Sequence, residues 1–176
     1  MTDLSGMNRS GDLRAGEPVM LTDRKKRRYL IDLVDGGEFH SHSGVLPHDE
    51  MIGNPEGETY RSSRGMVFIA VRPTITDFIL KMPRGAQVVY PKDVGPILII
   101  ADIFPGARVL ESGLGSGALS TGLLRAGAEI TGYEIRDDFE QGARDNVGRF
   151  LGQAALEQYQ TQVRDVYEGI DETDLD

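Results

Sequence analysis

The fold is decided by the stretch Ala107-Arg108-Val109-Leu110-Glu111-Ser112-Gly113-Leu114-Gly115-Ser116-Gly117-Ala118-Leu119-Ser120. A short apolar run ends in an acid, a glycine-rich segment follows, and a helix-forming segment comes next. This order is typical of a buried strand that turns sharply into a helix over a glycine loop. The three glycines of the loop allow positive φ, and they let a ligand approach the backbone where a Cβ would clash. The stretch therefore predicts a loop that receives a nucleotide-like ligand.

A second predicted strand follows the loop and also ends in an acid. It covers Glu129-Ile130-Thr131-Gly132-Tyr133-Glu134. Glu134 lies about 20 residues past the loop, which is the spacing at which a carboxylate reaches the ribose hydroxyls of a bound nucleoside.

Length and composition are those of an ordinary globular protein. The chain has 176 residues, of which 39% are hydrophobic and 27% charged. No stretch approaches the roughly 18 apolar residues of a membrane helix, and the N-terminus lacks a basic region followed by an apolar one, so no membrane partner is expected. The absence of cysteine excludes disulfides, thiolate metal sites and a cysteine nucleophile, and it suits a cytoplasmic protein.

The net charge of -9 is unevenly distributed. Residues 1–93 contain 13 Lys and Arg and 13 Asp and Glu, whereas residues 94–176 contain 6 and 15. A nucleic-acid partner is therefore expected to be held mainly by the first half of the chain or by a surface formed between subunits.

The first half of the chain predicts a small β-module. Residues 1–16 lack apolar periodicity and are expected to form a flexible arm. Residues 17–72 predict a β-barrel or sandwich, because short strands recur every 8–12 residues between turn signals. The basic segment Arg24-Lys25-Lys26-Arg27 is expected to be a turn between strands at 19–23 and 28–34. The other expected strands lie within 38–49, 59–63 and 66–71.

The second half changes period and predicts an α/β domain. Residues 73–106 are expected to form a helical linker, with helices over 74–82 and 94–100. Residues 107–176 then predict three parallel strands and two helices, with strands at 107–111, 129–134 and 162–167 and helices at 118–126 and 137–150. Three strands are half of the usual parallel sheet, so the domain is predicted to be the N-terminal half of a Rossmann-like fold, incomplete at its C-terminus.

Several cofactors are compatible with a Gly-x-Gly-x-Gly loop after a strand. Nicotinamide cofactors, flavins and S-adenosylmethionine all use such loops, and a tight turn that binds nothing is a further alternative. The acid Glu111 directly before the loop suits a ligand with an ammonium group better than a pyrophosphate, and the dinucleotide spacing Gly-x-Gly-x-x-Gly is not met. S-adenosylmethionine is therefore the favoured cofactor.

Several further motifs extend the pattern beyond the glycine loop. They are Tyr-Pro-Lys-Asp at 90–93, Asp-Ile-Phe-Pro-Gly-Ala-Arg-Val-Leu-Glu at 102–111, Gly-Tyr-Glu-Ile-Arg at 132–136, Ala-Arg-Asp-Asn-Val at 143–147 and Glu-Phe-His-Ser-His-Ser-Gly at 38–44. Together with the loop, they resemble the tRNA (adenine-58-N1)-methyltransferases of the TrmI type, over roughly residues 17–168. The resemblance implies a class I, S-adenosylmethionine-dependent methyltransferase that modifies N1 of adenosine 58 in the T-loop of tRNA and works as a homotetramer.

The resemblance also assigns roles to residues. The loop would wrap the methionine part of the cofactor, Glu134 would hold the ribose hydroxyls, and residues near Phe139 would flank the adenine. Asp165 would accept a hydrogen bond from the adenine amino group, and Tyr90 would sit close to the cofactor. The loop residues with this role are Gly113, Leu114, Gly115, Ser116, Gly117 and Ala118.

Two departures from the family pattern stand out. The family's catalytic aspartate lies in a motif of the form Asp-Leu-Pro-x-Pro-Trp, which does not occur before Asp176, and the chain has no tryptophan. The connection at 123–129 is also shorter than is usual in the family. The catalytic residue is thus unknown and expected beyond Asp176, and residues 1–176 are predicted to bind the cofactor through half a site without methylating.

Other functions and sites remain open from the sequence. The main alternative is a non-catalytic RNA-binding or scaffold subunit, or an inactive fragment; a nicotinamide-dependent oxidoreductase is disfavoured by the loop spacing. His40, His42 and His48 are not expected to bind metal, because no acidic or thiol ligand set accompanies them. The basic segment 24–28 predicts either a phosphate contact or a solvated turn.

Overall fold

The computed structural model describes residues 10–85 and 87–176. The chain divides between Lys81 and Met82 into two compact units, which are described separately. Within the described ranges, no helix is both long and apolar enough to cross a membrane.

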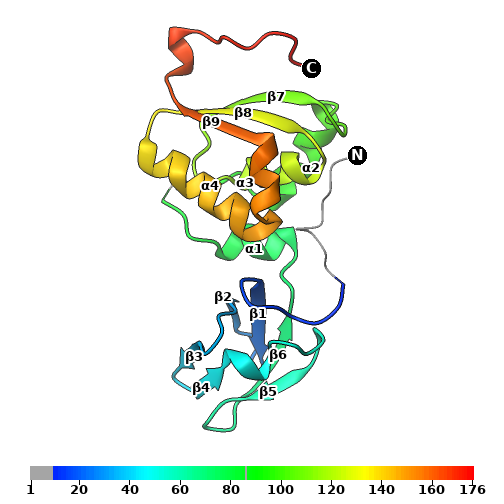
Figure 1. Cartoon of the computed structure of the whole chain (residues 1–176), viewed down its shortest axis with the longest axis vertical. Helices are drawn as coiled ribbons and strands as arrows, with labels where there is room; N and C mark the ends of the chain where they lie inside the picture. Colours follow the sequence, from blue (N-terminus) through cyan, green and yellow to red (C-terminus); the bar gives the residue numbers. More distant parts are fainter. Residues whose placement is uncertain (1–9, 86) are drawn as a thin grey trace. The chain divides into compact units, whose positions relative to one another are not determined.

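The first unit is a β-module of two antiparallel sheets (Figure 1). Its larger sheet has the strand order β2-β1-β6-β5, and the hairpin β3-β4 forms the second sheet. The strands are β1 (Pro18–Asp23), β2 (Arg28–Asp32), β3 (Glu38–Ser41), β4 (Gly44–Pro47), β5 (Thr59–Arg61) and β6 (Val67–Val71). The 3-10 helix η2 (His48–Glu50) follows β4. The predicted β-module is therefore confirmed, with a strand in each of the expected segments.

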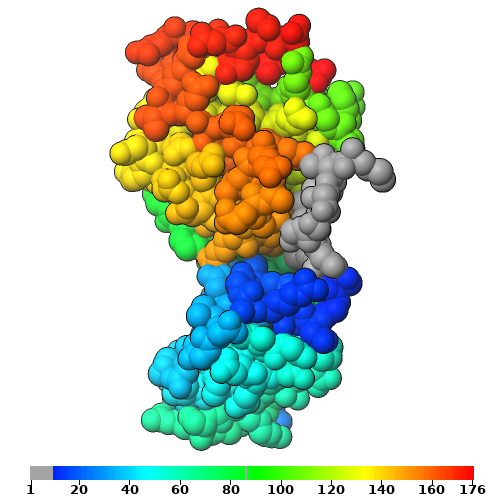
Figure 2. Space-filling view, viewed as in Figure 1, coloured from blue at the N-terminus to red at the C-terminus, as the bar shows by residue number. Residues whose placement is uncertain are grey.

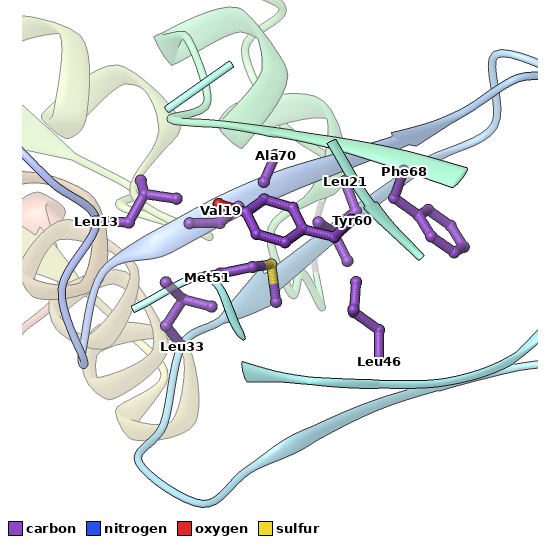
Figure 3. Packing of buried hydrophobic residues seen from close by; sticks show 9 residues of the cluster. All are labelled: Leu13, Val19, Leu21, Leu33, Leu46, Met51, Tyr60, Phe68 and Ala70. Carbon is purple, nitrogen blue, oxygen red and sulfur yellow. The ribbon is translucent and has the colours of Figure 1, made fainter. Parts of the chain in front are cut away.

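The core of the β-module is apolar and draws on both sheets. Figure 3 shows side chains from β1, β4, β5 and β6 converging with those of the connecting loops. Aromatic rings also pack together in this module. The ring centroid of Phe39 lies 5.6 Å from that of Phe68 and 5.1 Å from that of Tyr29. The cluster comprises Leu13, Val19, Leu21, Leu33, Leu46, Met51, Tyr60, Phe68 and Ala70.

Residues 1–16 were predicted to form a flexible arm, and this prediction is wrong for the described residues 10–16. Leu13 is only 1% exposed, because it packs into the core of the β-module. Its backbone N–H donates to the carbonyl of Asn54 at 2.8 Å, and the N–H of Gly16 donates to Leu33 at 2.7 Å. A single apolar side chain in a polar segment carries no periodicity, so the sequence did not reveal this contact. Residues 1–9 of the predicted arm lie outside the described residues.

The short helix α1 (Ile75–Lys81) forms where a helix was predicted, and Thr74 caps its start. The Oγ1 of Thr74 accepts from the N–H of Asp77, and the Asp77 carboxylate accepts from the N–H of Thr74, both at 3.1 Å. Two of the unpaired N–H groups at the helix start are thereby satisfied. Helix α2 (Pro91–Ile100) begins three residues before the expected position, because Pro91 occupies the first helical turn, where a missing N–H costs nothing.

The second unit is a three-stranded parallel sheet with helices on one face (Figure 1). The strand order is β7-β8-β9, and the apolar sides of α3 and α4 pack against β8 through residues such as Leu123, Ile130 and Val147. The further elements are β7 (Arg108–Ser112), α3 (Ala118–Arg125), β8 (Glu129–Glu134), α4 (Asp137–Leu151), η3 (Gln153–Gln158), β9 (Tyr159–Val163) and η4 (Val166–Glu168). The Rossmann-like fold class is confirmed.

The third strand lies earlier in the chain than predicted. The expected range was 162–167, whereas β9 begins at Tyr159, which pairs with Ile130 and is fully buried. Its hydroxyl donates to the Oγ of Ser120 at 2.9 Å. The strand position is therefore decided by a contact with a helix 39 residues away, which local alternation cannot reveal.

The C-terminal residues run beside the edge strand β7. The N–H of Asp176 donates to the carbonyl of Arg108 at 3.1 Å, and the Asp176 carboxylate accepts from the N–H of Arg108 at 2.9 Å. Figure 2 shows the C-terminal residues, in red, next to green and yellow atoms of the same unit. Asp176 thereby satisfies the backbone N–H and carbonyl of Arg108 on the edge strand β7, which would otherwise be open for pairing with another strand.

Candidate cofactor-binding site

The glycine loop joins β7 to α3 in a left-handed backbone conformation. Gly113, Gly115 and Gly117 have φ values of 84°, 54° and 75°. Only glycine adopts this region without strain, so the predicted positive φ of the three glycines is confirmed. The N–H of Gly113 donates to the carbonyl of Tyr133 at 2.7 Å, which extends the pairing of β7 and β8 into the loop.

Gly117 has a second, steric requirement. A Cβ at this position would lie 2.9 Å from the carbonyl oxygen of Ala143 and 3.1 Å from its Cα. By contrast, a Cβ on Gly113 would meet nothing within 4 Å. Gly117 therefore allows close packing of the loop on α4, whereas Gly113 leaves open space beside the backbone.

Glu134 ends β8 next to the loop, and its carboxylate is bound by backbone amides. Its Oε2 accepts from the N–H of Gly115 at 3.0 Å, and its Oε1 accepts from Ile135 at 2.9 Å and Arg136 at 3.2 Å. The residue is 6% exposed. Because each carboxylate oxygen can accept more than one hydrogen bond, the side chain can still accept from hydroxyl groups of a ligand. The carboxyl end of a parallel strand is where open α/β sheets bind ligands.

Phe139 lies in the first turn of α4 and is covered on one side by a cation. The guanidinium of Arg136 is 3.9 Å from the ring centroid. A Cβ on Gly85 would lie 2.9 Å from the ring, so the segment before α2 passes directly against Phe139. The ring is half-buried and belongs to the same end of the sheet as Glu134.

Asn146 joins two segments of the site, and no role was predicted for it. Its buried side-chain amide donates to the carbonyl of Ser116 at 3.1 Å and to that of Pro83 at 2.9 Å. It thereby ties the glycine loop to the segment that passes Phe139. A polar residue on the apolar side of α4, next to Val147, was the available signal, because a buried amide requires partners.

Glu111, the acid before the loop, belongs to a series of hydrogen-bonded side chains inside the unit. Its carboxylate accepts from the Oγ of Ser120 at 2.7 Å, and the hydroxyl of Tyr159 donates to the same Oγ at 2.9 Å. Burial raises the pKa of Glu111 to about 7, although the Ser120 hydrogen bond opposes this effect. The pKa of Tyr159 is raised as well, by burial and by the nearby Glu111. Glu111 thus holds β7 to α3, and its expected pairing with a ligand ammonium group stays a prediction.

Asp165 and Tyr90 are less closely integrated than the loop residues. Asp165 follows β9 and caps η4, where its side chain accepts from the N–H of Tyr167 at 2.9 Å. Tyr90 precedes α2 and is 42% exposed. Both stand near the start of a helical turn, and no hydrogen bond joins either of them to the glycine loop within the described residues.

One hollow of the α/β unit lies away from the glycine loop, and two of the histidines contact other residues of the β-module. A hollow of about 310 Å³ lies at the amino ends of the strands, beside Arg108 and Glu129, which is the end opposite the loop. No group of three His, Cys, Asp or Glu side chains in the described part of the chain could hold a metal ion. His48 is buried and accepts from the N–H of Val34 at 3.1 Å, while His40 contacts Glu38 at 2.9 Å.

Two family models match successive parts of the chain. "TrmI-like N-terminal" covers residues 11–59, and "tRNA methyltransferase complex GCD14 subunit" covers residues 65–174. The chain belongs to the TrmI-type tRNA methyltransferase family. The family resemblance carried by the sequence motifs is confirmed.

Curated members of the family are similar over most of this chain. It is 39% identical over 136 residues to a tRNA (adenine(58)-N(1))-methyltransferase TrmI of Thermus thermophilus, covering 76% of this chain and 53% of that protein. It is 36% identical over 134 residues to a tRNA (adenine(57)-N(1)/adenine(58)-N(1))-methyltransferase TrmI of Methanocaldococcus jannaschii, covering 74% and 46%. The chain thus spans about half the length of these relatives.

Two solved structures share the fold. A SAM-dependent O-methyltransferase from Thermotoga maritima superposes with a TM-score of 0.84 at 33% identity, covering 93% of this chain and 62% of the other. The tRNA (m1A58) methyltransferase TrmI from Aquifex aeolicus superposes with a TM-score of 0.74 at 29% identity, covering 91% and 62%.

Proposed function

We propose that the α/β unit is the S-adenosylmethionine-binding part of a tRNA (adenine-58-N1)-methyltransferase. The observation that carries the proposal is the backbone of Gly113–Gly117 lying against the carboxylate of Glu134, which accepts from the N–H of Gly115 at 3.0 Å. Membership of the TrmI-type family supports the cofactor and the substrate class. The methyl acceptor in this proposal is N1 of adenosine 58 in the T-loop of tRNA.

Each residue of the site has a binding or orienting role in the proposed reaction. The loop from Gly113 to Ala118 holds the methionine part of the cofactor, Glu134 accepts from the ribose hydroxyls, and Phe139 packs against the adenine. Asp165 accepts from the adenine amino group, and Tyr90 borders the cofactor. S-adenosylmethionine supplies an activated methyl group as a sulfonium, so the protein chiefly aligns the acceptor nitrogen with that methyl.

The methylated adenine carries a positive charge, which a carboxylate would stabilise by accepting the N6 proton. The proposed residue for this step is an aspartate outside residues 1–176. The tRNA base must also leave its stacked position to reach the cofactor. In the proposal the enzyme is a cytoplasmic homotetramer, as the family resemblance implies; sedimentation equilibrium of the purified protein tests the assembly.

Titration calorimetry with S-adenosylmethionine tests the cofactor site. The chain should bind S-adenosylmethionine and not NAD. The substitution Glu134→Gln should weaken binding by about ten- to a hundredfold, because charge-assisted hydrogen bonds contribute roughly 1.5–3 kcal/mol. Glu129→Gln is the matched control, since Glu129 is an exposed carboxylate at the opposite end of the same strand. Equal affinity of both variants, or absence of binding to the unaltered chain, would contradict the proposal.

A further inference from the structure

Three hairpin turns meet at one end of the β-module. Residues 24–27 join β1 to β2, residues 42–43 join β3 to β4, and residues 62–66 join β5 to β6. Strands β1 and β6 are antiparallel with Asp23 opposite Phe68, which puts the first and third turns at the same end (Figure 1).

Hydrogen bonds bring the middle turn to the same place. The Oγ of Ser62 donates to the carbonyl of Ser43 at 2.5 Å, and Arg64 donates from Nη1 to the carbonyl of His42 at 3.2 Å. Arg27 of the first turn lies beside the same histidine, with its Nη1 2.8 Å from the His42 Nε2. These three turns together are called the turn end below.

The turn end is cationic, and apart from Asp23, which ends β1, most carboxylates of the module lie elsewhere. The turns carry the five cations Arg24, Lys25, Lys26, Arg27 and Arg64, and their segments contain no acid. Most acids of the module flank the opposite ends of the strands, namely Glu17, Asp32, Glu38, Asp49, Glu50, Glu56 and Glu58. The positive and negative charges of the module are therefore concentrated toward opposite ends of its strands. They are equal in number, since residues 9–81 contain 11 of each.

One cation of the turn end, Arg27, has a structural role. The buried carboxylate of Asp23 accepts from Arg27 Nε at 2.6 Å and from the N–H groups of Lys25 and Arg27 at 2.8 and 2.9 Å. This bonding fixes the first turn. Arg24, Lys25 and Lys26 are exposed, and none of them forms an ion pair within residues 10–85 and 87–176. Their charges are available to a partner.

A hollow of about 390 Å³ opens between the first and third turns. Arg24 and Lys25 line it from one side and Arg64 from the other, with Ser43 and Gly65 contributing further lining. The hydrogen bond to the carbonyl of His42 holds the Arg64 guanidinium in place. Cations on two sides of one hollow suit an anion that enters between them.

We propose that the turn end binds the sugar-phosphate backbone of RNA, which under the proposed function is the backbone of tRNA. Several cations without interspersed acids match a polymer that presents a phosphate at every residue, and binding releases its condensed counterions. The α/β unit has a net negative charge, which disfavours broad contact with such a polymer: residues 82–176 contain 16 Asp and Glu against 8 Lys and Arg. The turn end is thus the favoured place on this chain for a phosphate contact.

A charge-matched pair of variants tests the proposal. The turn variant Arg24→Gln/Lys25→Gln/Lys26→Gln removes three exposed cations from the turn end, and the control variant Arg14→Gln/Lys81→Gln/Arg125→Gln removes three exposed cations from elsewhere. Binding of an unmodified tRNA transcript is followed by fluorescence anisotropy over a range of salt concentrations. The turn variant should lose about tenfold or more in affinity at low salt, and its salt slope should fall by about 2 to 3. The control should change less than about threefold.

The double variant Lys25→Arg/Lys26→Arg should keep the affinity of the unaltered chain, because it keeps the charge. Equal losses in the turn and control variants, or no loss in the turn variant, would overturn the proposal. So would an unaltered chain that binds poly-glutamate through these residues but not tRNA, which would point to an acidic protein partner. Calorimetry with S-adenosylmethionine on the same samples tests the proposed cofactor site independently of the RNA contact. All variants should bind the cofactor with the affinity of the unaltered chain.

Discussion

The turn end of the β-module and the glycine-loop end of the α/β unit are built alike but present different groups to a ligand. Both are chain reversals gathered at one end of a sheet, and both are fixed by a buried carboxylate that accepts from backbone amides: Asp23 in the β-module and Glu134 in the α/β unit. Asp23 is also neutralised by Arg27, at 2.6 Å. Glu134 forms no ion pair within the described residues. The carboxylate therefore completes a scaffold in one unit and keeps acceptor capacity in the other.

This difference separates two kinds of ligand contact. At the turn end, the buried acid is satisfied and cations face outward, which suits phosphates. At the glycine loop, the carboxylate itself faces the site, which suits ribose hydroxyls. The comparison predicts that the two ends can be damaged independently.

Two glycine substitutions should have the largest effects, one in each unit. A Cβ on Gly117 would lie 2.9 Å from the carbonyl of Ala143, and a Cβ on Gly44 would lie 2.8 Å from the N–H nitrogen of Arg64. Both glycines have positive φ, 75° and 103°. Gly117→Ala and Gly44→Ala should each reduce the free energy of unfolding in urea by about 3 kcal/mol, from backbone strain plus overpacking. Gly117→Ala should impair S-adenosylmethionine binding, and Gly44→Ala should impair tRNA binding.

Controls for this pair come from glycines with positive φ in open space. A Cβ added to Gly113 (φ 84°) or to Gly53 (φ 82°) would meet nothing within 4 Å. Their alanine variants should lose only about 1–2 kcal/mol, which is the strain alone. If Gly117→Ala weakened tRNA binding as much as cofactor binding, the two ends would not be independent.

The substitution Glu111→Gln should make the free energy of unfolding less dependent on pH, because Glu111 is a buried titratable group of the α/β unit. Burial raises the pKa of Glu111 from 4.5 to about 7 in the folded protein. The folded state therefore binds the proton more tightly, and stability falls as the pH rises from about 4.5 to 7. The loss should amount to about 3 kcal/mol above pH 7, at 1.36 kcal/mol for each pKa unit.

The measurement is the free energy of unfolding in urea between pH 4.5 and pH 8. The Glu111→Gln variant should have a flatter profile than the unaltered chain over this range. Glu129→Gln provides the comparison, because Glu129 is exposed on the neighbouring strand of the same sheet. A Glu111→Gln profile parallel to that of the unaltered chain would show that Glu111 stays ionised in its buried position.

Asn146→Ala should have the smallest effect of the three on stability. It leaves the carbonyls of Ser116 and Pro83 without their donor, which costs about 1–3 kcal/mol for buried groups. Affinity for S-adenosylmethionine should fall severalfold, because the loop is no longer tied to the segment that passes Phe139. Asn54→Ala removes an exposed donor to the carbonyl of Glu50 in the β-module and should change stability by less than about 0.5 kcal/mol. Equal effects of the two variants would rule out a positioning role for Asn146.

Features encoded by neighbouring residues were predictable from the sequence. The apolar run before Gly113, the spacing of the three glycines and the acid at Glu134 predicted strand, loop and strand, because each depends on backbone freedom or on alternation within a few residues. The cap of α1 was predicted from Thr74 for the same reason. Features that depend on distant partners were missed or misplaced: the burial of Leu13, the start of β9 at Tyr159 and the two hydrogen bonds of Asn146.

By itself, the sequence determined the order of the elements, the family and the position of the glycine loop. Local backbone preferences and short periodicities are sufficient for the elements and the loop, and the family follows from the resemblance of the motifs. Only the tertiary structure decided which polar side chains are buried together, as in the chain from Glu111 through Ser120 to Tyr159, and which turns share one end of the β-module. The reason is physical: hydrogen bonds and charge clusters form between residues that are close in space, and sheet pairing brings together residues that lie tens of positions apart.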